Sequence, residues 1–528
     1  MDLADLVTTA ASDPVLAARL DGLTSWHADW SGLRVLVLGL GVTGFAVADT
    51  LAELGARVVV LAPTVDDDRA ELLGLIGAEL VLDPDMASVP QRVVDFDAEL
   101  VVLSPGFAPH HPLAVAAVES TAAVWGDVEL AWRLRDKTAR VADWLLVTGT
   151  NGKTTTTQLA TAMALADGRR AAAVGNIGVP VLDAVRDPEG LDVLVVELSS
   201  HQLHWLPVEG PGALRPRASV CLNLESDHLE WHGSFDAYRD AKARVYENTV
   251  VACVYNKADQ ATVRMVEQAD VAEGCRAVGF GLSAPGPSEV GIVSGDEGGV
   301  LVDRAFLAER RHRALELTTT GELEAAGLGA DHLVEDVLAA AALVRAVDVD
   351  PVAVRDALRA FRVDHHRTEV VAESAGVVWV DDSKATNPHA AHASLGAFPS
   401  VVWVVGGTFK GVDPEPLVRD AVAGLRAAVL IGVDRVGLRE AFRRHAPELP
   451  VFEVVETDTE RVMPTAVRLA AAAARPGDTV LLAPAAASFD QFTDYTARGR
   501  AFAAAVAHHL GGDADGAEAD QPPASPAD

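Results

Sequence analysis

A glycine-rich segment that ends in Gly-Lys-Thr has the composition of a loop that binds nucleotide phosphates. Residues 145–157 read Leu-Leu-Val-Thr-Gly-Thr-Asn-Gly-Lys-Thr-Thr-Thr-Thr, which is an apolar run, a turn and a helix-like segment. Main-chain N–H groups at such a helix start can surround a phosphate, which the helix dipole also favours. Lys153 would reach the β- and γ-phosphates, and the Thr154 hydroxyl would ligate Mg²⁺. The segment therefore predicts ATP binding.

This loop supplies most of the predicted ATP contacts. They are Gly149, Thr150, Asn151, Gly152, Lys153, Thr154 and Thr155. Val147 stands where the usual loop has its first glycine, so a shorter core from Gly149 to Thr154 carries the motif. The alternative interpretation is an ordinary glycine-rich turn between a strand and a helix.

Charged residues follow further apolar runs. Glu197 ends one of them, and a carboxylate beside a phosphate loop is a suitable second Mg²⁺ ligand. The loop 223–233 carries three acids and two histidines. A histidine between acids at a strand end, such as His228, is a candidate ligand or substrate contact. Lys242 lies on a predicted helix over 238–246, where its spacing alone indicates a surface lysine.

A second glycine motif lies near the N-terminus. Residues 39–44 read Gly-Leu-Gly-Val-Thr-Gly after an apolar run, the pattern that seats a diphosphate at a helix start. An NAD site would also need an acid at the end of the next strand, where this chain has Ala62-Pro63-Thr64. The motif therefore favours a diphosphate-bearing sugar nucleotide over NAD. The alternative is a set of glycines needed only for packing.

Three polar loops follow apolar runs in the last third of the chain. They span 381–388, 406–411 and 484–492. The first contains Lys384, a cation suited to a carboxylate ligand. Ligands of α/β sheets bind at the carboxyl ends of strands, so these loops together predict a site for an anionic co-substrate.

The overall composition excludes several classes of function. The 528 residues carry a formal net charge of −33, which argues against general binding of nucleic acids or anionic membranes. Cys221, Cys253 and Cys275 are widely spaced and fit a reducing cytoplasm. The acidic N-terminus and the lack of a long apolar run lead us to expect neither a signal peptide nor a membrane-spanning segment. Residues 511–528 carry five acids and no base, which predicts a disordered tail.

Short apolar runs alternate with segments rich in alanine and leucine along most of the chain. Eleven runs are expected to be strands: 34–38, 58–61, 100–103, 144–147, 193–196, 218–222, 251–255, 377–380, 401–405, 428–431 and 479–482. Continuous apolar strands between helices are typical of parallel sheets covered on both faces. Residues 275–320 are glycine-rich and alternating, which favours antiparallel strands. Domain joints are expected near 123–127 and 363–364.

In this order, the motifs resemble the Mur ligases, a family of ATP-dependent amide-forming enzymes of peptidoglycan precursor synthesis. The shared segments are 148–155, 197–200, 227–228, Lys242, 382–387 and 484–492. The resemblance covers residues 30–508. The member that adds D-glutamate is the most similar, on segments 39–44, 104–106, 126–130, 175–178, 382–387 and 488–492.

The resemblance implies an α/β fold with the three-domain Mur ligase architecture. Residues 1–125 would form a Rossmann-like domain for the UDP-sugar, 126–363 a central P-loop domain for ATP, and 364–510 a Rossmann-like domain for the amino acid. Residues 511–528 would form the acidic tail. Because the binding residues lie on different domains, we expect domain closure to assemble the site.

The resemblance also implies a reaction. The γ-phosphoryl group of ATP would pass to the carboxylate of UDP-N-acetylmuramoyl-L-alanine, and the amine of D-glutamate would displace phosphate from the acyl phosphate. The implied partners are these three small molecules only, with no nucleic acid and no membrane insertion. A cytoplasmic monomer is expected.

Site residues follow from the same resemblance, position by position. Lys153, Lys242 and His228 are the implied catalytic residues, and Arg367 would contact ATP. The implied ligands of two Mg²⁺ ions are Thr154, Glu197, His228 and Lys242, the last as a carbamate formed with CO₂. The UDP-substrate would contact Val42, Thr43, Ser104 and Asn176, and D-glutamate would contact Lys384, Thr386, Ser488 and Phe489.

Some positions depart from the family pattern. The usual His-Asn-x-x-Asn reads His332-Leu333-Val334-Glu335-Asp336, so both amides are replaced. Ala62-Pro63-Thr64 replaces an Asp-Thr-Arg of some members, and Tyr495 replaces a phenylalanine near the glutamate site. None of these positions belongs to the metal or phosphate machinery.

Three alternatives remain from the sequence. The first is a ligase of the same superfamily that adds another amino acid, such as L-alanine, a diamino acid or a glutamate on folate. The second is a sugar-nucleotide-binding regulatory protein without phosphate release. The third is an NAD-dependent oxidoreductase, which the missing acid after residues 58–61 disfavours.

Overall fold

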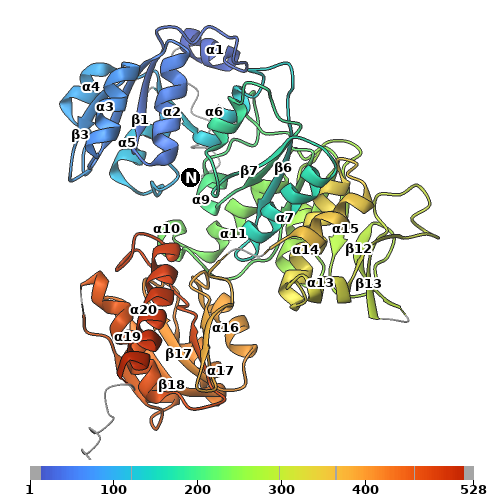
Figure 1. The fold of residues 1–528 in the computed structure, drawn as a ribbon. Helices are drawn as coiled ribbons and strands as arrows, with labels where there is room; N and C mark the ends of the chain where they lie inside the picture. Colours follow the sequence, from blue (N-terminus) through green and yellow to red (C-terminus); the bar gives the residue numbers. More distant parts are fainter. Residues whose placement is uncertain (1–13, 121, 296–297, 363–364, 457, 517–528) are drawn as a thin grey trace, which may run out of the picture. The chain divides into compact units, whose positions relative to one another are not determined.

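A computed structural model describes residues 14–120, 122–295, 298–362, 365–456 and 458–516 (Figure 1). The chain forms two compact units. The first consists of Met1–Leu224 and Trp231–Arg362, and the second of Glu225–Glu230 and Val363–Asp528. Among the described residues, two sheets belong to the first unit and one belongs to the second. In this part of the chain, no helix combines the length and apolar character that a membrane crossing requires.

The first sheet is parallel, with strand order β3-β2-β1-β4-β5. Its strands are β1 (Arg34–Leu38), β2 (Arg57–Ala62), β3 (Glu79–Leu82), β4 (Leu100–Leu103) and β5 (Ala123–Gly126). Helix α1 (Pro14–Gly22) precedes β1, and the helices between the strands are α2 (Val42–Glu53), α3 (Asp67–Ile76), α4 (Gln91–Phe96) and α5 (Pro112–Glu119).

Alternate residues of β1 explain the two helical layers of this sheet. Val35 and Val37 pack in a core that includes α2, whereas Leu36 and Leu38 pack in a core that includes α4 and α5. Successive side chains of a strand point to opposite faces, so an all-apolar strand needs cover on both. Gly44 allows α2 to start close to the sheet, because a side chain there would collide with the Gly39 carbonyl.

The second sheet has the order β14-β13-β12-β11-β10-β9-β6-β8-β7. Its strands are β6 (Asp143–Thr148), β7 (Ala171–Gly175), β8 (Val193–Glu197), β9 (Ala218–Cys221), β10 (Ala252–Asn256), β11 (Arg276–Phe280), β12 (Glu289–Gly295), β13 (Gly298–Asp303) and β14 (Leu315–Thr319). Strands β6 to β12 pair in parallel, and β12, β13 and β14 pair antiparallel. The antiparallel prediction for 275–320 is therefore confirmed for these last three strands.

The helices around the second sheet include the one that begins in the glycine-rich segment 149–155. They are α6 (Asp127–Arg133), α7 (Lys153–Ala166), α8 (Val181–Val185), α9 (Ser200–His204), α10 (Leu229–His232), α11 (Phe235–Ala243), the 3₁₀ turn η2 (Arg244–Tyr246), α12 (Gln260–Gln268), α13 (Thr320–Ala325), α14 (Asp331–Arg345) and α15 (Pro351–Ala360). Helix α7 packs against α14 and α15.

The third sheet has the order β15-β16-β20-β17-β18-β19, parallel except for β15 with β16. Its strands are β15 (Glu369–Ser374), β16 (Val377–Asp381), β17 (Val401–Gly406), β18 (Leu425–Ile431), β19 (Val451–Glu453) and β20 (Thr479–Leu482). The helices are α16 (Pro388–Gly396), α17 (Glu415–Ala421), the 3₁₀ turn η3 (Val422–Gly424), α18 (Val436–His445), α19 (Thr459–Ala473) and α20 (Tyr495–Gly516).

Two cores cover the faces of this third sheet. Val402 and Val404 of β17 pack with α19 and α20, while Trp403 packs with α16, α17 and α18. Figure 1 shows the sheet between α19 and α20 on one side and α16 and α17 on the other. The carboxyl ends of β16, β20 and β17 are therefore neighbours, and their loops share one edge of the sheet.

The eleven strands predicted from apolar runs are all present, with ends shifted by three residues at most. Residues 123–127, predicted as a joint, contain β5 and the start of α6. The joint predicted at 363–364 lies outside the described residues. Helix α20 runs to Gly516, past the predicted start of the tail at 511, because each further residue adds a helical hydrogen bond. Residues 517–528 of that tail lie outside the described residues.

Candidate active site

The predicted phosphate loop, residues 149–155, follows β6 and continues into the first turn of α7. Gly152 caps α7 with φ +82°, and a side chain there would collide with the Asp336 carboxylate and approach Leu222. Only glycine fits this position without strain. Asp336 is one of the departures from the family pattern, and it accepts a hydrogen bond from Thr156 Oγ1 at 3.2 Å. The Asp336 carboxylate therefore stabilises the first turn of α7 through this hydrogen bond. The expectation that no departure belongs to the phosphate machinery was therefore wrong for this residue.

The loop is also held by Asn223, which follows the neighbouring strand β9. The main-chain nitrogens of Thr150 and Asn151 donate to the Asn223 main-chain oxygen (3.0 Å) and side-chain oxygen (2.8 Å). Lys153 Nζ donates to the carbonyl oxygens of Gly149 (2.9 Å) and Thr150 (2.8 Å), so its side chain lies back over the loop. Thus the loop has a fixed shape, with a cation directly above its turn.

Lys242 lies in α11 with 2% of its surface exposed, so the surface interpretation from spacing was wrong. Its Nζ donates to the Gly149 carbonyl oxygen (2.7 Å) and to Thr148 Oγ1 (3.2 Å), and lies 5.0 Å from the centre of the Tyr238 ring. Lys242 shares a buried helix face with Tyr238, and its amine meets the phosphate loop rather than solvent. The amine is thus part of the same site as Lys153.

Glu197 ends β8, the strand beside β6, and is 1% exposed. Its Oε1 accepts a hydrogen bond from Asn176 Nδ2 at 2.8 Å. Its Oε2 is buried and has no hydrogen-bond partner among the described residues. An unpaired buried carboxylate oxygen is costly, and a bound cation would satisfy it. The donor set therefore fits a hard divalent cation such as Mg²⁺.

Strand order explains why these residues meet. Adjacent strands β9, β6, β8 and β7 are parallel, and Glu197 is in register with both Val147 and Gly175. The residues that follow them therefore gather at one edge of the sheet. This edge brings together the 149–155 loop, Glu197, Asn176 and, from α11, Lys242.

His228 belongs to the short segment that the second unit takes from the middle of the chain. Lys410 Nζ, after β17, lies 3.0 Å from Asp227 Oδ1 and 3.3 Å from His228 Nε2. Sequence reasoning singled out the loop 406–411 but not Lys410 itself. The sequence does not reveal the role of Lys410, because its partner Asp227 is 183 residues away along the chain.

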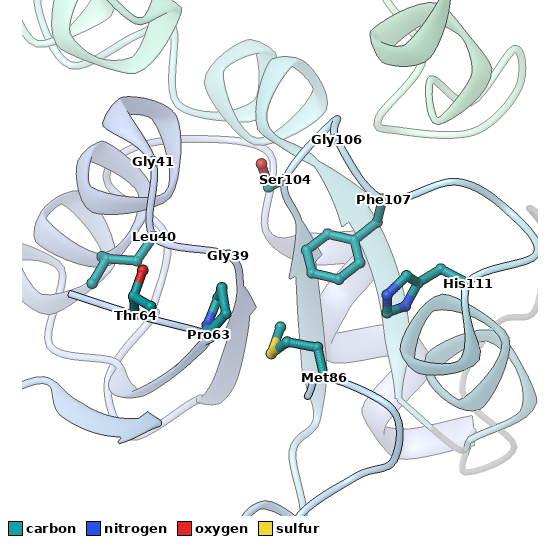
Figure 2. A pocket seen from close by; sticks show the side chains of 10 residues that line it. All are labelled: Gly39, Leu40, Gly41, Pro63, Thr64, Met86, Ser104, Gly106, Phe107 and His111. Atoms are coloured by element: carbon teal, nitrogen blue, oxygen red, sulfur yellow. The ribbon is translucent and has the colours of Figure 1, made fainter. Parts of the chain in front are cut away.

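A separate pocket of about 450 Å³ opens at the carboxyl ends of β1, β2 and β4 (Figure 2). Its lining consists of Gly39, Leu40, Gly41, Pro63, Thr64, Met86, Ser104, Gly106, Phe107 and His111. Leu40, Pro63 and Thr64 lie along one side, and Met86, Phe107 and His111 lie along the other. The lining residues include no carboxylate, so an anionic ligand meets no repulsion from them. Such edges are the usual ligand sites of parallel α/β sheets.

Of the four residues predicted to contact the UDP-substrate, one lines this pocket. Ser104 lines it, while Val42 and Thr43 begin α2 and are not among the lining residues. Val42 has 62% of its surface exposed. Asn176, the fourth, lies at the end of β7 in the second sheet. The contacts of Val42 and Thr43 remain predictions.

The loops of the third sheet bring the predicted amino-acid contacts to one edge. Lys384 and Thr386 follow β16, and Ser488 and Phe489 follow β20, the adjacent strand. Lys384 Nζ donates to the Tyr495 hydroxyl at 3.0 Å. Ser488 is 2% exposed, whereas the Phe489 side chain is 76% exposed.

Arg367 precedes β15 at the same edge, between two residues in the left-handed region, His366 (φ +67°) and Thr368 (φ +46°). His366 Nδ1 lies 2.6 Å from Asp381 Oδ2, and the Thr368 nitrogen donates to Asp382 Oδ1 at 3.2 Å. Burial raises the pKa of both aspartates. The Arg367 Nε is buried without a hydrogen-bond partner among the described residues. These anchors hold Arg367 in a fixed, strained turn.

Two acids of α6 are buried in the first unit. Burial raises the pKa of Asp127 to about 6, although Gln202 Nε2 lies 3.4 Å from its carboxylate. Burial raises the pKa of Glu129 to about 7, against the opposing effect of Arg133 at 2.8 Å. Both carboxylates are therefore held in an environment that disfavours their charge.

The chain matches two protein-family descriptions, and it is similar to several known proteins over nearly their whole length. Residues 147–344 match the Mur ligase middle domain, and residues 366–486 match the Mur ligase glutamate ligase domain. The UDP-N-acetylmuramoylalanine--D-glutamate ligase of Leifsonia xyli subsp. xyli is 63% identical over 511 residues, which are 96% of this chain and 98% of that protein. The protein of the same description from Streptomyces avermitilis is 51% identical over 482 residues, covering 90% of this chain and 98% of the relative.

Solved structures with the same fold are more distant in sequence. The UDP-N-acetylmuramate-alanine ligase MurC from Thermotoga maritima has a TM-score of 0.54 at 18% identity, covering 91% of this chain and 100% of that chain. The MurF ligase from Thermotoga maritima in complex with ADP has a TM-score of 0.51 at 18% identity, covering 92% of this chain and 96% of that chain. These likenesses concern the fold alone.

Proposed function

The chain belongs to the Mur ligase family, and from that premise we propose how its three sheets divide the work of the reaction. The chain is an ATP-dependent ligase that adds D-glutamate to UDP-N-acetylmuramoyl-L-alanine in peptidoglycan precursor synthesis, and so serves cell wall biogenesis, cell shape and cell division. The observation that carries this conclusion is the 63% identity, over 96% of the chain, to a D-glutamate ligase.

The second sheet would bind ATP. The support is the loop 149–155, a glycine-rich turn at the start of α7 with Lys153 lying over it, because loops of this type bind nucleotide phosphates through main-chain N–H groups and a lysine. Lys153 now donates to two carbonyl oxygens of its own loop, and it would turn to the β- and γ-phosphates when ATP enters. Arg367, whose Nε is buried without a hydrogen-bond partner among the described residues, would contact ATP.

Mg²⁺ would be held first by Thr154 and Glu197. The support is the buried Glu197 Oε2, which has no other partner among the described residues, and the 7% exposed Thr154 at the start of α7. Bound Mg²⁺ would neutralise the charge that develops on the transferring phosphoryl group. Asn176 would keep the Glu197 carboxylate oriented through its 2.8 Å hydrogen bond.

A second Mg²⁺ would be held by His228 and by Lys242 as a carbamate. CO₂ adds to a neutral amine and releases a proton, which turns a cation into an anionic oxygen donor. Lys242 is 2% exposed beside the phosphate loop, and this position suits a metal ligand better than a solvated ammonium. His228 would supply the neutral imidazole donor.

The pocket of the first sheet would hold the UDP portion of the substrate. Gly39 and Gly41 immediately precede α2, where main-chain N–H groups can meet a diphosphate, and Ser104 lies directly beside Gly39. The third sheet would hold D-glutamate, with the Lys384 ammonium paired to a carboxylate and Thr386, Ser488 and Phe489 completing the site.

The chain's own groups then act in a fixed order. The phosphate loop, Lys153 and Arg367 hold the γ-phosphoryl group in line with the carboxylate of UDP-N-acetylmuramoyl-L-alanine, and one carboxylate oxygen attacks phosphorus as ADP leaves. The acyl phosphate is an electrophile that the free carboxylate is not. The amine of D-glutamate attacks the carbonyl carbon, the C–O bond to phosphate breaks, and the amine loses a proton. We further propose that the protein acts as a cytoplasmic monomer with only these small-molecule partners.

Phosphate release tests the proposal. With ATP, Mg²⁺ and UDP-N-acetylmuramoyl-L-alanine present, we expect release of phosphate with D-glutamate and none with L-glutamate or L-alanine. Release with another amino acid would change the substrate assignment. Absence of release with every amino acid would favour a sugar-nucleotide-binding protein without ligase activity.

A further inference from the structure

The first turn of α20 contacts the loops that would bind D-glutamate. Arg498 is 1% exposed, and its guanidinium group donates three hydrogen bonds. Nε donates to Ser383 Oγ (3.0 Å), Nη2 to the Ser383 carbonyl oxygen (2.8 Å) and Nη1 to the Ala486 carbonyl oxygen (3.0 Å). Ser383 lies in the loop after β16, and Ala486 lies in the loop after β20. A single buried side chain therefore joins the two loops.

Tyr495, the first residue of α20, contacts the same loop as Arg498. Its carbonyl oxygen accepts a hydrogen bond from Ser383 Oγ at 2.8 Å. Its hydroxyl accepts one from Lys384 Nζ at 3.0 Å, and its ring centre lies 4.6 Å from that nitrogen. An ammonium group can donate three hydrogen bonds, so this contact fixes its direction and leaves its charge intact. The Lys384 side chain is thus held by both the ring and the hydroxyl of Tyr495.

We propose that Tyr495 and Arg498 are positioning residues of the amino-acid site: Arg498 clamps the two substrate loops together, and Tyr495 sets the direction of the Lys384 ammonium. This inference rests on the proposed role of Lys384 in binding the amino acid. Neither residue needs to touch the reacting atoms. A carboxylate is bound well only when its cation is held close to the productive geometry, so loosening either contact weakens binding of the amino acid first.

The guanidinium group is well suited to its task. Its donors are fixed in one plane and reach two carbonyl oxygens and a hydroxyl at once. A lysine at this position would keep the charge but could not reach all three acceptors in the same geometry. Gly499 contributes space, because a side chain there would collide with His366 and approach Asp381. The helix therefore lies directly against the loop that it positions.

The test compares Tyr495→Phe and Arg498→Lys with two matched controls, Tyr255→Phe in β10 and Arg500→Lys, which is exposed on α20 itself. Phosphate release gives kcat and the KM of each substrate, and thermal unfolding reports whether each variant is folded. We expect Tyr495→Phe to raise the KM for D-glutamate about tenfold, the size of a lost hydrogen bond to a charged group, with the KM for ATP unchanged. For Arg498→Lys we expect kcat/KM for D-glutamate to fall about 100-fold.

An unchanged KM for D-glutamate in Tyr495→Phe would overturn the inference, as would an equal rise in the KM of all three substrates. If Arg498→Lys does not fold, Tyr495→Phe still decides the question, because it keeps the ring and removes one oxygen. If the wild-type chain uses a different amino acid, the proposed substrate is wrong. The KM of Tyr495→Phe for that amino acid would then test the positioning role separately.

Discussion

Replacing Asp127 with asparagine tests the electrostatics of the buried α6 acids. Burial raises the pKa of Asp127 from 3.8 to about 6. The unfolded chain therefore releases this proton at lower pH than the folded chain does. Stability from this group is complete below about pH 4, is lost as the pH rises toward 6, and stays constant above that. Two pKa units correspond to about 3 kcal/mol, by which the ionised carboxylate destabilises the fold at neutral pH.

Asparagine has the same shape and no charge, so Asp127→Asn should be more stable than the wild type at neutral pH. We expect a gain of about 3 kcal/mol at pH 7.5 and about 2 kcal/mol at pH 5.5, where part of the wild-type group is protonated. For a unit as large as the first one, a gain of this size corresponds to a rise in melting temperature of roughly 4 °C. Thermal unfolding of both proteins at the two pH values provides the measurement.

The matched control is Asp68→Asn, an exposed acid in the first turn of another helix, α3. It should change the melting temperature little at either pH. A variant at position 127 that is less stable than the wild type at pH 7.5 would refute the reasoning. An equal gain at both pH values would also refute it, because the effect would then not come from titration.

Three further substitutions test the site. Lys153→Ala should reduce phosphate release by about 10³-fold or more, through loss of charge neutralisation at the transferring phosphate, whereas near-normal turnover would contradict the ATP-site assignment. Lys242→Ala should be nearly inactive and partly recovered by added formate or acetate, which can replace the carbamate; normal turnover without them would exclude that role. Ser104→Phe should fill the first-sheet pocket and raise the KM for UDP-N-acetylmuramoyl-L-alanine at least tenfold, with the KM for ATP unchanged; equal effects on both would argue that the pocket serves another purpose.

The strands of this fold were predictable because they are buried on both faces. An all-apolar run such as Val401–Gly406 has few interpretations other than a central strand of a parallel sheet. Strands missed from the sequence, such as β3 and β19, are short and only partly buried, so their composition carries little signal. The alternation in 275–320 identified antiparallel strands because one face of such a ribbon can remain in contact with water.

Site residues were predictable where a local motif carries the chemistry. The loop 149–155 and Glu197 follow strands that the sequence already identified, so their meeting at one sheet edge follows from topology. The burial of Lys242 was not predictable from spacing, because helical periodicity tells which residues share a face and not what covers that face. Lys410 was missed for a similar reason, since its partner Asp227 lies far away in sequence.

The central claim is that the carboxylate of UDP-N-acetylmuramoyl-L-alanine is activated by phosphorylation before D-glutamate attacks. It can be tested with substrate that carries ¹⁸O in that carboxylate. We expect each phosphate released in the presence of ATP and D-glutamate to contain one ¹⁸O atom, because the C–O bond breaks when the amine attacks. Unlabelled phosphate, or ¹⁸O found in the nucleotide product, would contradict it.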